Sequence, residues 1–387
     1  MDHESMYRKE KRMKRFKSGA LSLLAAALLM GCTEADDDGM WRGRTEVVAG
    51  ASRVISDAPV RHAPDQTADV TLEEDLVIQG GEGPSFASVF GITTDRSGNI
   101  YIADSDLKQI SRFDESGSFQ SAVGSLGVGP LQFRSPVDMA VDDEGRLFVL
   151  DNELDRVTVL NPDLTFADIW STQVTKPRRI RIDAEGNVLV FVITQHDLIY
   201  KYSPEGDPIT KFYNPMETLR RTGTLKEFIA YSDAAMETTE DGYVVVSAKH
   251  PYWIRKFDRV NGLELEFYRT TPFAMNPMAR WTATRQPPPV GVSGGLAVLP
   301  DGRIVNSIQY QEFEQIGLNV MGMPRLQLTK LDRWFDFFRP DGKWEMSAQF
   351  DVVGVPMHVD RQGRIYFAEL EEDRVVRYHF VFPEEYN

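Results

Sequence analysis

The sequence has little of what many enzymes and secreted domains depend on. Cysteine occurs once, at Cys32, so an intramolecular disulfide is excluded. Histidine occurs only six times. The chain contains no G-x-S-x-G, H-E-x-x-H or glycine-rich phosphate-binding motif. The residues therefore specify no nucleophile, no zinc protease helix and no nucleotide site.

A long apolar run is missing as well. The apolar stretch Ala20–Met30 is too short to cross a bilayer comfortably as a helix. Seven basic residues precede it between Arg8 and Lys17, and Gly31 and Cys32 follow it. This order resembles a bacterial lipoprotein signal peptide. The resemblance implies that residues 1–31 are removed and that Cys32 is acylated and becomes the mature N-terminus.

Basic residues are scarce after the signal peptide. Seven of the 43 Lys and Arg residues and three of the 58 Asp and Glu residues precede Cys32, which leaves 36 against 55 and a net charge of −19. A field of that sign opposes nucleic acid and anionic lipid surfaces, so we expect membrane attachment through the lipid on Cys32 only. The polar residues 32–69 predict a flexible acidic tether. Thr33 follows the cysteine, which by analogy with lipoprotein sorting implies the outer membrane if the organism has one.

What the sequence does contain is a repeat. An acidic turn that ends in Gly is followed by β-branched or aromatic residues, and Gly supplies the positive φ that tight hairpin turns need. The turn occurs six times, at intervals that are similar but longer in the second half of the chain. The six glycines are Gly98, Gly145, Gly186, Gly242, Gly302 and Gly363.

Each repeat is long enough for four short strands. A four-stranded sheet of this size cannot bury both faces alone, whereas sheets stacked radially bury each other. The sequence therefore predicts an all-β fold, a six-bladed β-propeller of four-stranded antiparallel blades over residues 70–387. The last repeat has little room for a fourth strand. The strand-like run Val70–Ile78 has no blade of its own, and we expect it to close the ring.

Several short sequence segments make the resemblance more specific. Gly91-Ile-Thr-Thr-Asp, Ile100-Tyr-Ile-Ala-Asp104 and Ile110-Ser-Arg-Phe-Asp114 are similar to NHL repeats, and the second unit matches in the same way. Together with Cys32, they resemble the NHL-repeat-like six-bladed propeller lipoproteins of the bacterial envelope. The resemblance implies a fold and an exported, lipid-anchored location, and it does not imply a particular activity.

Three long insertions interrupt the repeat, over residues 214–233, 269–294 and 309–333. In a propeller all three would lie on one face, and long loops inside a compact fold are usually functional or disordered. The second contains no Asp or Glu and carries Arg280, Trp281 and Arg285. Arg and Trp dominate binding hot spots, so we predict that these three residues bind a protein, or an anionic small molecule or glycan. The alternative is a cap whose arginines pair with acidic blade edges.

The central channel is a second candidate site. Alternation along the first strand of each repeat turns Arg181, Glu237 and His358 towards the axis. Arg179 is placed to pair with Asp138 on the adjacent blade, and Arg181 with Glu237. These charges either plug the channel or contact a ligand, and His358, which has no obvious partner, is the better single candidate for ligand contact.

Six-bladed propellers also include lactonase-like and amidating-lyase-like metal enzymes. A metal site needs three or four converging ligands. His196, His250 and His358 would share one face, which keeps a metal-dependent hydrolase or lyase at the channel mouth as the alternative function. No cofactor is indicated. The favoured interpretation is a monomeric, lipid-anchored envelope propeller that binds a ligand on its insertion-bearing face.

Overall fold

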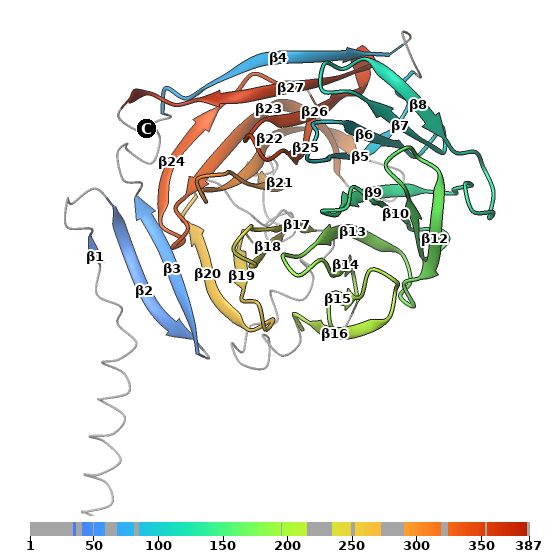
Figure 1. Ribbon diagram of the computed structural model, residues 1–387. Coiled ribbons are helices and arrows are strands. Elements are labelled where there is room, and N and C mark those ends of the chain that lie inside the picture. Colours follow the sequence, from blue (N-terminus) through green and yellow to red (C-terminus); the bar gives the residue numbers. More distant parts are fainter. Residues whose placement is uncertain are drawn as a thin grey trace, which may run out of the picture.

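The computed structural model describes residues 34–35, 41–48, 50–58, 68–80, 85–194, 196–214, 234–248, 252–271, 290–318, 324–352 and 354–384. Within these ranges the protein consists of β-strands, with the 3-10 turn Leu370–Glu372 as the single helical element. No helix in these ranges is long and apolar enough to cross a lipid bilayer. The strands form six sheets arranged around a common centre (Figure 1).

The first three sheets contain four antiparallel strands each, in chain order from the centre outward. Blade 1 comprises β5 (Val89–Thr94), β6 (Ile100–Asp104), β7 (Gln109–Phe113) and β8 (Phe119–Val123). Blade 2 comprises β9 (Pro136–Val141), β10 (Leu147–Asp151), β11 (Arg156–Leu160) and β12 (Phe166–Ser171). Blade 3 comprises β13 (Pro177–Ile182), β14 (Val188–Val192), β15 (Ile199–Tyr202) and β16 (Pro208–Phe212).

The other three sheets complete the ring and vary more. Blade 4 comprises β17 (Ala234–Thr238), β18 (Val244–Ala248), β19 (Ile254–Phe257) and β20 (Leu263–Arg269). Blade 5 comprises β21 (Val290–Val298), β22 (Ile304–Leu318), β23 (Pro324–Phe338) and β24 (Trp344–Gln349). Blade 6 comprises β25 (Val355–Val359), β26 (Ile365–Glu369), β27 (Arg374–Val381) and β4 (Thr71–Gln79). The predicted six-bladed β-propeller is confirmed.

The second strand of a blade carries the core. Every residue of β6, β10, β14, β18 and β26 is buried. These strands read as nearly continuous apolar runs because neighbouring blades cover both of their faces. The innermost strands contact one another in sequence around the ring, from β5 through β25 and back to β5. Within the described ranges the core therefore lies between neighbouring blades, in six clusters of buried residues.

The repeated acidic turn joins the first and second strands. Gly98 and Gly145 have φ angles of 81° each, in the left-handed region that favours glycine. The carboxylate of Asp142 accepts the backbone N–H groups of Glu144 and Arg146 at 3.0 and 2.8 Å. An aspartate at the start of the turn thus stabilises it through its own side chain.

A second repeated aspartate, at the end of the second strand, orders the loops that lead into blades 1 and 2. Asp104 accepts backbone N–H bonds from Ala87 and Ser88, and also from Asp106 and Leu107, at 2.7–3.0 Å. Asp151 accepts four equivalent backbone bonds one blade later. One buried carboxylate therefore ties the loop that enters a blade to the turn between its second and third strands.

The ring is closed by the N-terminal strand, as the sequence predicts. Strand β4 pairs antiparallel with β27, from Thr71 opposite Val381 to Gln79 opposite Arg374. In Figure 1 it runs along the outer side of blade 6. Ala68 N also donates to Ser347 O of blade 5 at 2.8 Å, so the segment before β4 is tied to the preceding blade. Closure covers an edge of β27 that would otherwise be open to pairing with another chain.

The expected flexible tether over residues 32–69 is wrong for much of its length. Strands β2 (Arg42–Val48) and β3 (Ala51–Ala58) form a hairpin, and β1 (Glu34–Ala35) pairs with the outer side of β2. Strand β3 runs parallel to β20, with Ser52 opposite Leu265 and Ser56 opposite Arg269. Blade 4 thus becomes a seven-stranded sheet, with the hairpin on its outer side (Figure 1).

Buried side chains explain why this hairpin is ordered. Trp41 is 1% exposed and packs in the core cluster between blades 4 and 5. Its Nε1 donates to Ser56 Oγ at 2.9 Å, and the same oxygen accepts the backbone N–H of Trp344 at 3.1 Å. A Cβ at Gly43 would lie 2.4 Å from the Trp41 ring, so only glycine fits beneath the indole. The polarity of these residues predicts a tether, but packing against residues far away in the sequence orders them as a hairpin.

Candidate functional site

Strand directions define two faces of the ring. The connections from one blade to the next, and those between second and third strands, lie together on one face, which we call the insertion face. Two of the predicted insertions fall between β16 and β17 and between β20 and β21. Arg280, Trp281 and Arg285 belong to the second of these and lie outside the described residues.

The third insertion is a projecting ribbon. Among the described residues, strand β21 pairs with β22 as far as Gln311, whereas β22 and β23 continue together to Leu318 and Pro324. Beyond Gln311 the described part of the blade is therefore a two-stranded ribbon on the insertion face. Isolated two-stranded ribbons are marginally stable in water, so what the ribbon presents on each side matters.

The two sides of the ribbon differ in chemistry. On one side the cross-strand pairs join Tyr310 to Asp332 and Glu312 to Lys330. Lys330 forms an ion pair with Asp332 at 2.7 Å, and Tyr310 donates to Glu312 at 2.8 Å. The other side carries Phe313, Leu326, Leu328 and Leu331, with Gln311 opposite Leu331 and Gln315 opposite Leu326. Leu328 and Leu331 are 44% and 43% exposed, so this side presents apolar surface interrupted by two glutamines.

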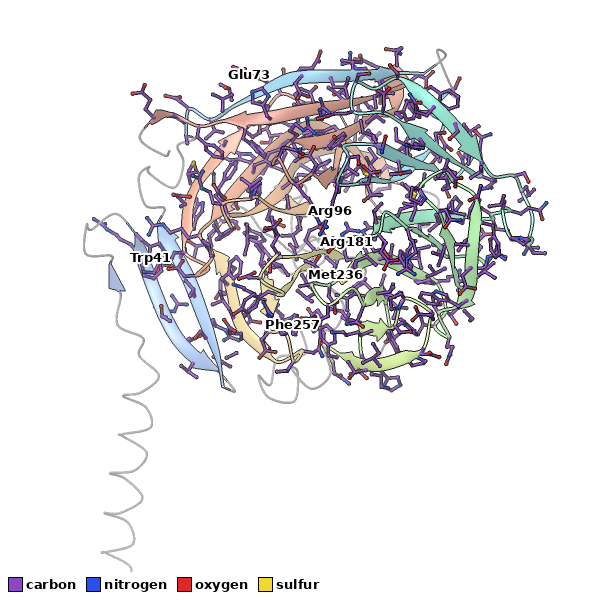
Figure 2. All side chains as sticks on the ribbon, viewed as in Figure 1. Trp41, Glu73, Arg96, Arg181, Met236 and Phe257 are labelled. Atoms are coloured by element: carbon purple, nitrogen blue, oxygen red, sulfur yellow. The ribbon has the colours of Figure 1, made fainter. Side chains whose placement is uncertain are left out.

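The channel centres on Arg181, on the innermost strand of blade 3 (Figure 2). Its Nη1 donates to Asp138 Oδ2 of blade 2 at 2.8 Å. Its Nε and Nη2 donate to the two carboxylate oxygens of Glu237 of blade 4 at 3.0 and 2.7 Å. The predicted pair of Arg181 and Glu237 is confirmed, and Arg181 links three consecutive blades.

The predicted pair of Arg179 and Asp138 is wrong. Arg179 Nη1 donates to the carbonyl of Arg178, while Asp138 accepts Arg181 and the backbone N–H of Ile180 at 2.9 Å. Burial alone would lower the pKa of Arg181, but the carboxylates of Asp138 and Glu237 raise it well above its ordinary value. Arg181 is therefore a permanent cation held between two anions. An anionic ligand would compete with these two carboxylates for the guanidinium.

His358, on the innermost strand of blade 6, has a partner that the sequence did not reveal. Its Nε2 lies 3.0 Å from Thr94 Oγ1 at the end of β5. Burial and then the positive charge of Arg181 lower the pKa of His358 to about 4, and Asp360 opposes this shift. The imidazole is therefore neutral at pH 7. Thr94 directly precedes the turn aspartate of its blade, a position shared by a residue of every repeat, so no sequence signal set it apart.

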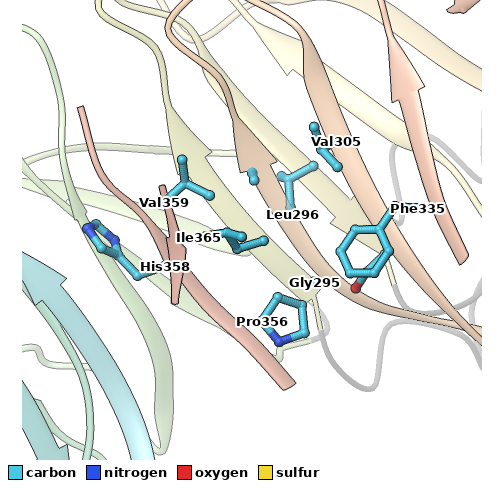
Figure 3. A pocket seen from close by; sticks show the side chains of 10 residues that line it. Gly295, Leu296, Val305, Phe335, Pro356, His358, Val359 and Ile365 are labelled. Atoms are coloured by element: carbon cyan, nitrogen blue, oxygen red, sulfur yellow. The ribbon is translucent and has the colours of Figure 1, made fainter. Parts of the chain in front are cut away.

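A small pocket lies beside His358, between blades 5 and 6 (Figure 3). Gly295 and Pro356 face each other across it, and a Cβ at Gly295 would lie 3.0 Å from Pro356 Cγ. Ser307 lines the pocket and is 6% exposed, and its Oγ has no hydrogen-bond partner among the described residues. His358 also lines the pocket, and the rest of the lining is apolar, including Phe335 and Ile365. The pocket is an apolar slot with one hydroxyl and one imidazole.

The shifted pKa of His358 predicts a pH dependence. The unfolded imidazole titrates near pH 6.5 and the folded one near 4, so the unfolded chain binds the proton first as pH falls. The contribution of neutral His358 to the free energy of unfolding is therefore complete above about pH 6.5 and is lost as pH falls towards 4. We expect the parent to lose about 3 kcal/mol more stability than His358→Gln between pH 7 and pH 4. Urea denaturation at each pH measures this, and equal losses would contradict it.

The histidines considered as metal ligands are not brought together in the described chain. His196 is exposed in the connection between β14 and β15, where its N–H donates to Thr194 Oγ1 at 3.1 Å. His250 lies outside the described residues, and His358 bonds Thr94. Over the described ranges, no group of three His, Cys, Asp or Glu side chains is arranged to hold a metal ion.

Comparisons with known proteins agree on the fold alone. No family model and no curated protein matches the sequence. Among solved structures, a proposed exported protein of Bacteroides fragilis is 11% identical, with a TM-score of 0.56 over 86% of this chain and 100% of that one. A DUF4221 family member from Bacteroides vulgatus is 10% identical, with a TM-score of 0.55 over 82% and 99%. Virginiamycin B lyase from Staphylococcus aureus is 12% identical, with a TM-score of 0.47 over 81% and 100%.

The class that the fold defines is the six-bladed β-propeller. The two Bacteroides structures match it over nearly their whole length. At these identities the likeness extends to the arrangement of strands and not to any activity. The function has to be argued from this chain's own residues.

Proposed function

We propose that this protein is a lipid-anchored propeller of the bacterial cell envelope that binds a protein or an anionic ligand on its insertion face. The observation that carries the proposal is that several features suited to binding lie on the same face of the ring. Both long interruptions between blades, and the side of the β22–β23 ribbon that presents apolar surface, belong to the same face. Exposed apolar surface beside long loops is typical of a binding surface.

The contacts inside the channel favour a ligand site on the insertion face over one deep in the channel. Arg181 has its guanidinium engaged by Asp138 and Glu237, and His358 is neutral and bonded to Thr94. These groups hold the blades together. A ligand is therefore more readily met by the insertion between blades 4 and 5, where Arg280 and Arg285 offer planar forks for carboxylate or phosphate and Trp281 offers a flat apolar surface.

The decisive experiment replaces Arg280, Trp281 and Arg285 together by Ala in a soluble form beginning at Thr33. Affinity capture from envelope extracts identifies the partner, and titration then compares parent and variant. We expect binding to be lost, because each hot-spot residue contributes about 1–3 kcal/mol. The matched control, Arg96→Ala with Arg361→Ala, removes two exposed arginines that pair with Asp143 on the opposite face. If the triple variant binds like the parent, the insertion is not the site.

The alternative of a metal-dependent hydrolase or lyase remains a separate candidate, and no observation within the described ranges favours it. Metal analysis of the purified soluble domain distinguishes the two functions. A stoichiometric metal ion lost on His358→Gln would favour the enzyme, because the binding function needs no metal.

A further inference from the structure

Two apolar side chains stand out on the surface. Val260 is 81% exposed and Val47 is 75% exposed, the highest values for large apolar residues in the part of the chain that the structure describes. Val260 lies in the turn between β19 and β20, and Val47 lies at the end of β2, beside the turn into β3. Although they are far apart in sequence, both belong to the extended sheet of blade 4.

The parallel pairing of β3 with β20 brings the two valines to one corner of the molecule. Because parallel strands start at the same end, the turn before β3 lies beside the turn before β20, with Ser52 opposite Leu265. The turns between third and fourth strands lie on the face opposite the insertion face. Val47 and Val260 therefore lie on the outer rim of blade 4, away from the insertions.

Strand β1 begins on the side of the hairpin that faces the same corner. Ala35 lies opposite Arg42 and Glu34 opposite Gly43, so the first residue of β1 is the one nearer to the end of β2 that carries Val47. Cys32 is two residues before Glu34, and two residues span at most about 7 Å. A lipid on Cys32 would therefore be held within a short reach of the blade 4 rim and not at the end of a long tether.

We propose that the outer rim of blade 4, at the corner formed by Val47 and Val260, is the surface that faces the lipid bilayer. The inference rests on the acylation of Cys32, which is part of the proposed function. It adds the orientation of the propeller relative to the bilayer. The strongly acidic chain opposes anionic headgroups, so contact at this corner comes from the acyl chains and the two valines. The insertion face then points away from the membrane, where a soluble partner has access to it.

A fluorophore on a single introduced cysteine tests the orientation in the acylated, full-length mature protein, in which Cys32 is already modified. Val260→Cys is compared with Ser116→Cys, its structural counterpart in blade 1, on the opposite side of the ring. Asp258 accepts the Val260 N–H at 3.0 Å, and Asp114 accepts the Ser116 N–H at 3.0 Å, so the two turns match. Leu318→Cys, 60% exposed on the ribbon, reports on the insertion face.

The labelled proteins are reconstituted into phosphatidylethanolamine and phosphatidylglycerol vesicles that contain a lipid with a nitroxide headgroup. We expect the label at position 260 to lose most of its fluorescence and the labels at 116 and 318 to lose almost none. Equal quenching at 260 and 116, or stronger quenching at 318, overturns the orientation. Mass spectrometry of the N-terminal peptide establishes acylation, and an unmodified Cys32 overturns both the anchor and the orientation. Partner binding by the soluble form is measured without the anchor, so its failure is a separate result.

Discussion

Deleting residues 33–58 is expected to destabilise the propeller severely, although this segment precedes the first blade. The deletion removes Trp41 from the core between blades 4 and 5 and takes Ser56 away from the backbone N–H of Trp344. It also breaks the ion pair of Arg53 with Glu266, at 2.7 Å, and leaves that carboxylate with Arg255 alone. The edge of β20 would lose its parallel partner and become open to aggregation.

A point variant separates packing from edge exposure. Trp41→Ala keeps the hairpin backbone and is expected to cost about 3–5 kcal/mol, as is usual for truncating a buried large aromatic residue. Val47→Ala, on the same hairpin but exposed, is the control and is expected to change stability by less than about 0.5 kcal/mol. Urea denaturation of the soluble forms measures both. If Trp41→Ala unfolds at the same urea concentration as the parent, the hairpin does not stabilise the ring.

Asp336→Ala is expected to have the second large effect, and at a position far from the hairpin. Asp336 is fully buried on β23 and pairs with Arg269 of blade 4 at 2.6 Å. It also accepts the hydroxyls of Tyr252 and Ser347, at 2.6 and 2.5 Å. Burial and the charge of Asp336 raise the pKa of Tyr252 well above its ordinary value, so the phenol stays a hydrogen-bond donor.

Without this carboxylate, the buried charge of Arg269 loses the one acidic partner that it has among the described residues. Removing one partner of a buried ion pair usually costs about 3–5 kcal/mol. The matched control is Asp143→Ala, whose carboxylate pairs with Arg96 and Arg361 at the surface and should contribute less than about 1 kcal/mol. Thermal and urea unfolding compare the two variants. Similar losses for both would mean that Asp336 does not join blades 4 and 5.

The repeat was predictable because its signals are local. A turn glycine such as Gly98 and an aspartate such as Asp142 act on residues within four positions, so their spacing in the sequence is their spacing in space. The closing strand was also predictable, because Val70–Ile78 looks like a strand without a blade of its own and the last repeat has little room for a fourth strand. Counting strands against blades required no knowledge of side-chain contacts.

The hairpin and the channel contacts were harder to predict, for a common physical reason. In the sequence, Arg44, Arg53 and Asp57 make the hairpin look like a solvated tether. Its position depends on contacts with distant residues, through Ser56 to Trp344 and through Arg53 to Glu266. In the channel, alternation correctly selected the strand positions of Arg181 and His358. It paired Arg181 with Glu237 but missed the bond from Arg181 to Asp138, because alternation does not show how far a long side chain reaches.

The two N-terminal elements have a consequence for the order in which the chain becomes structured. Strand β3 pairs with β20, which belongs to the fourth blade, and β4 pairs with β27, the last strand of the chain. During synthesis these strands emerge before the blades, yet both of their partner strands emerge late. Blades 1 to 3 have mostly local contacts and can form early, while long-range pairing is slow. We therefore expect the N-terminal strands to pair last, after β20 and β27 have been synthesised.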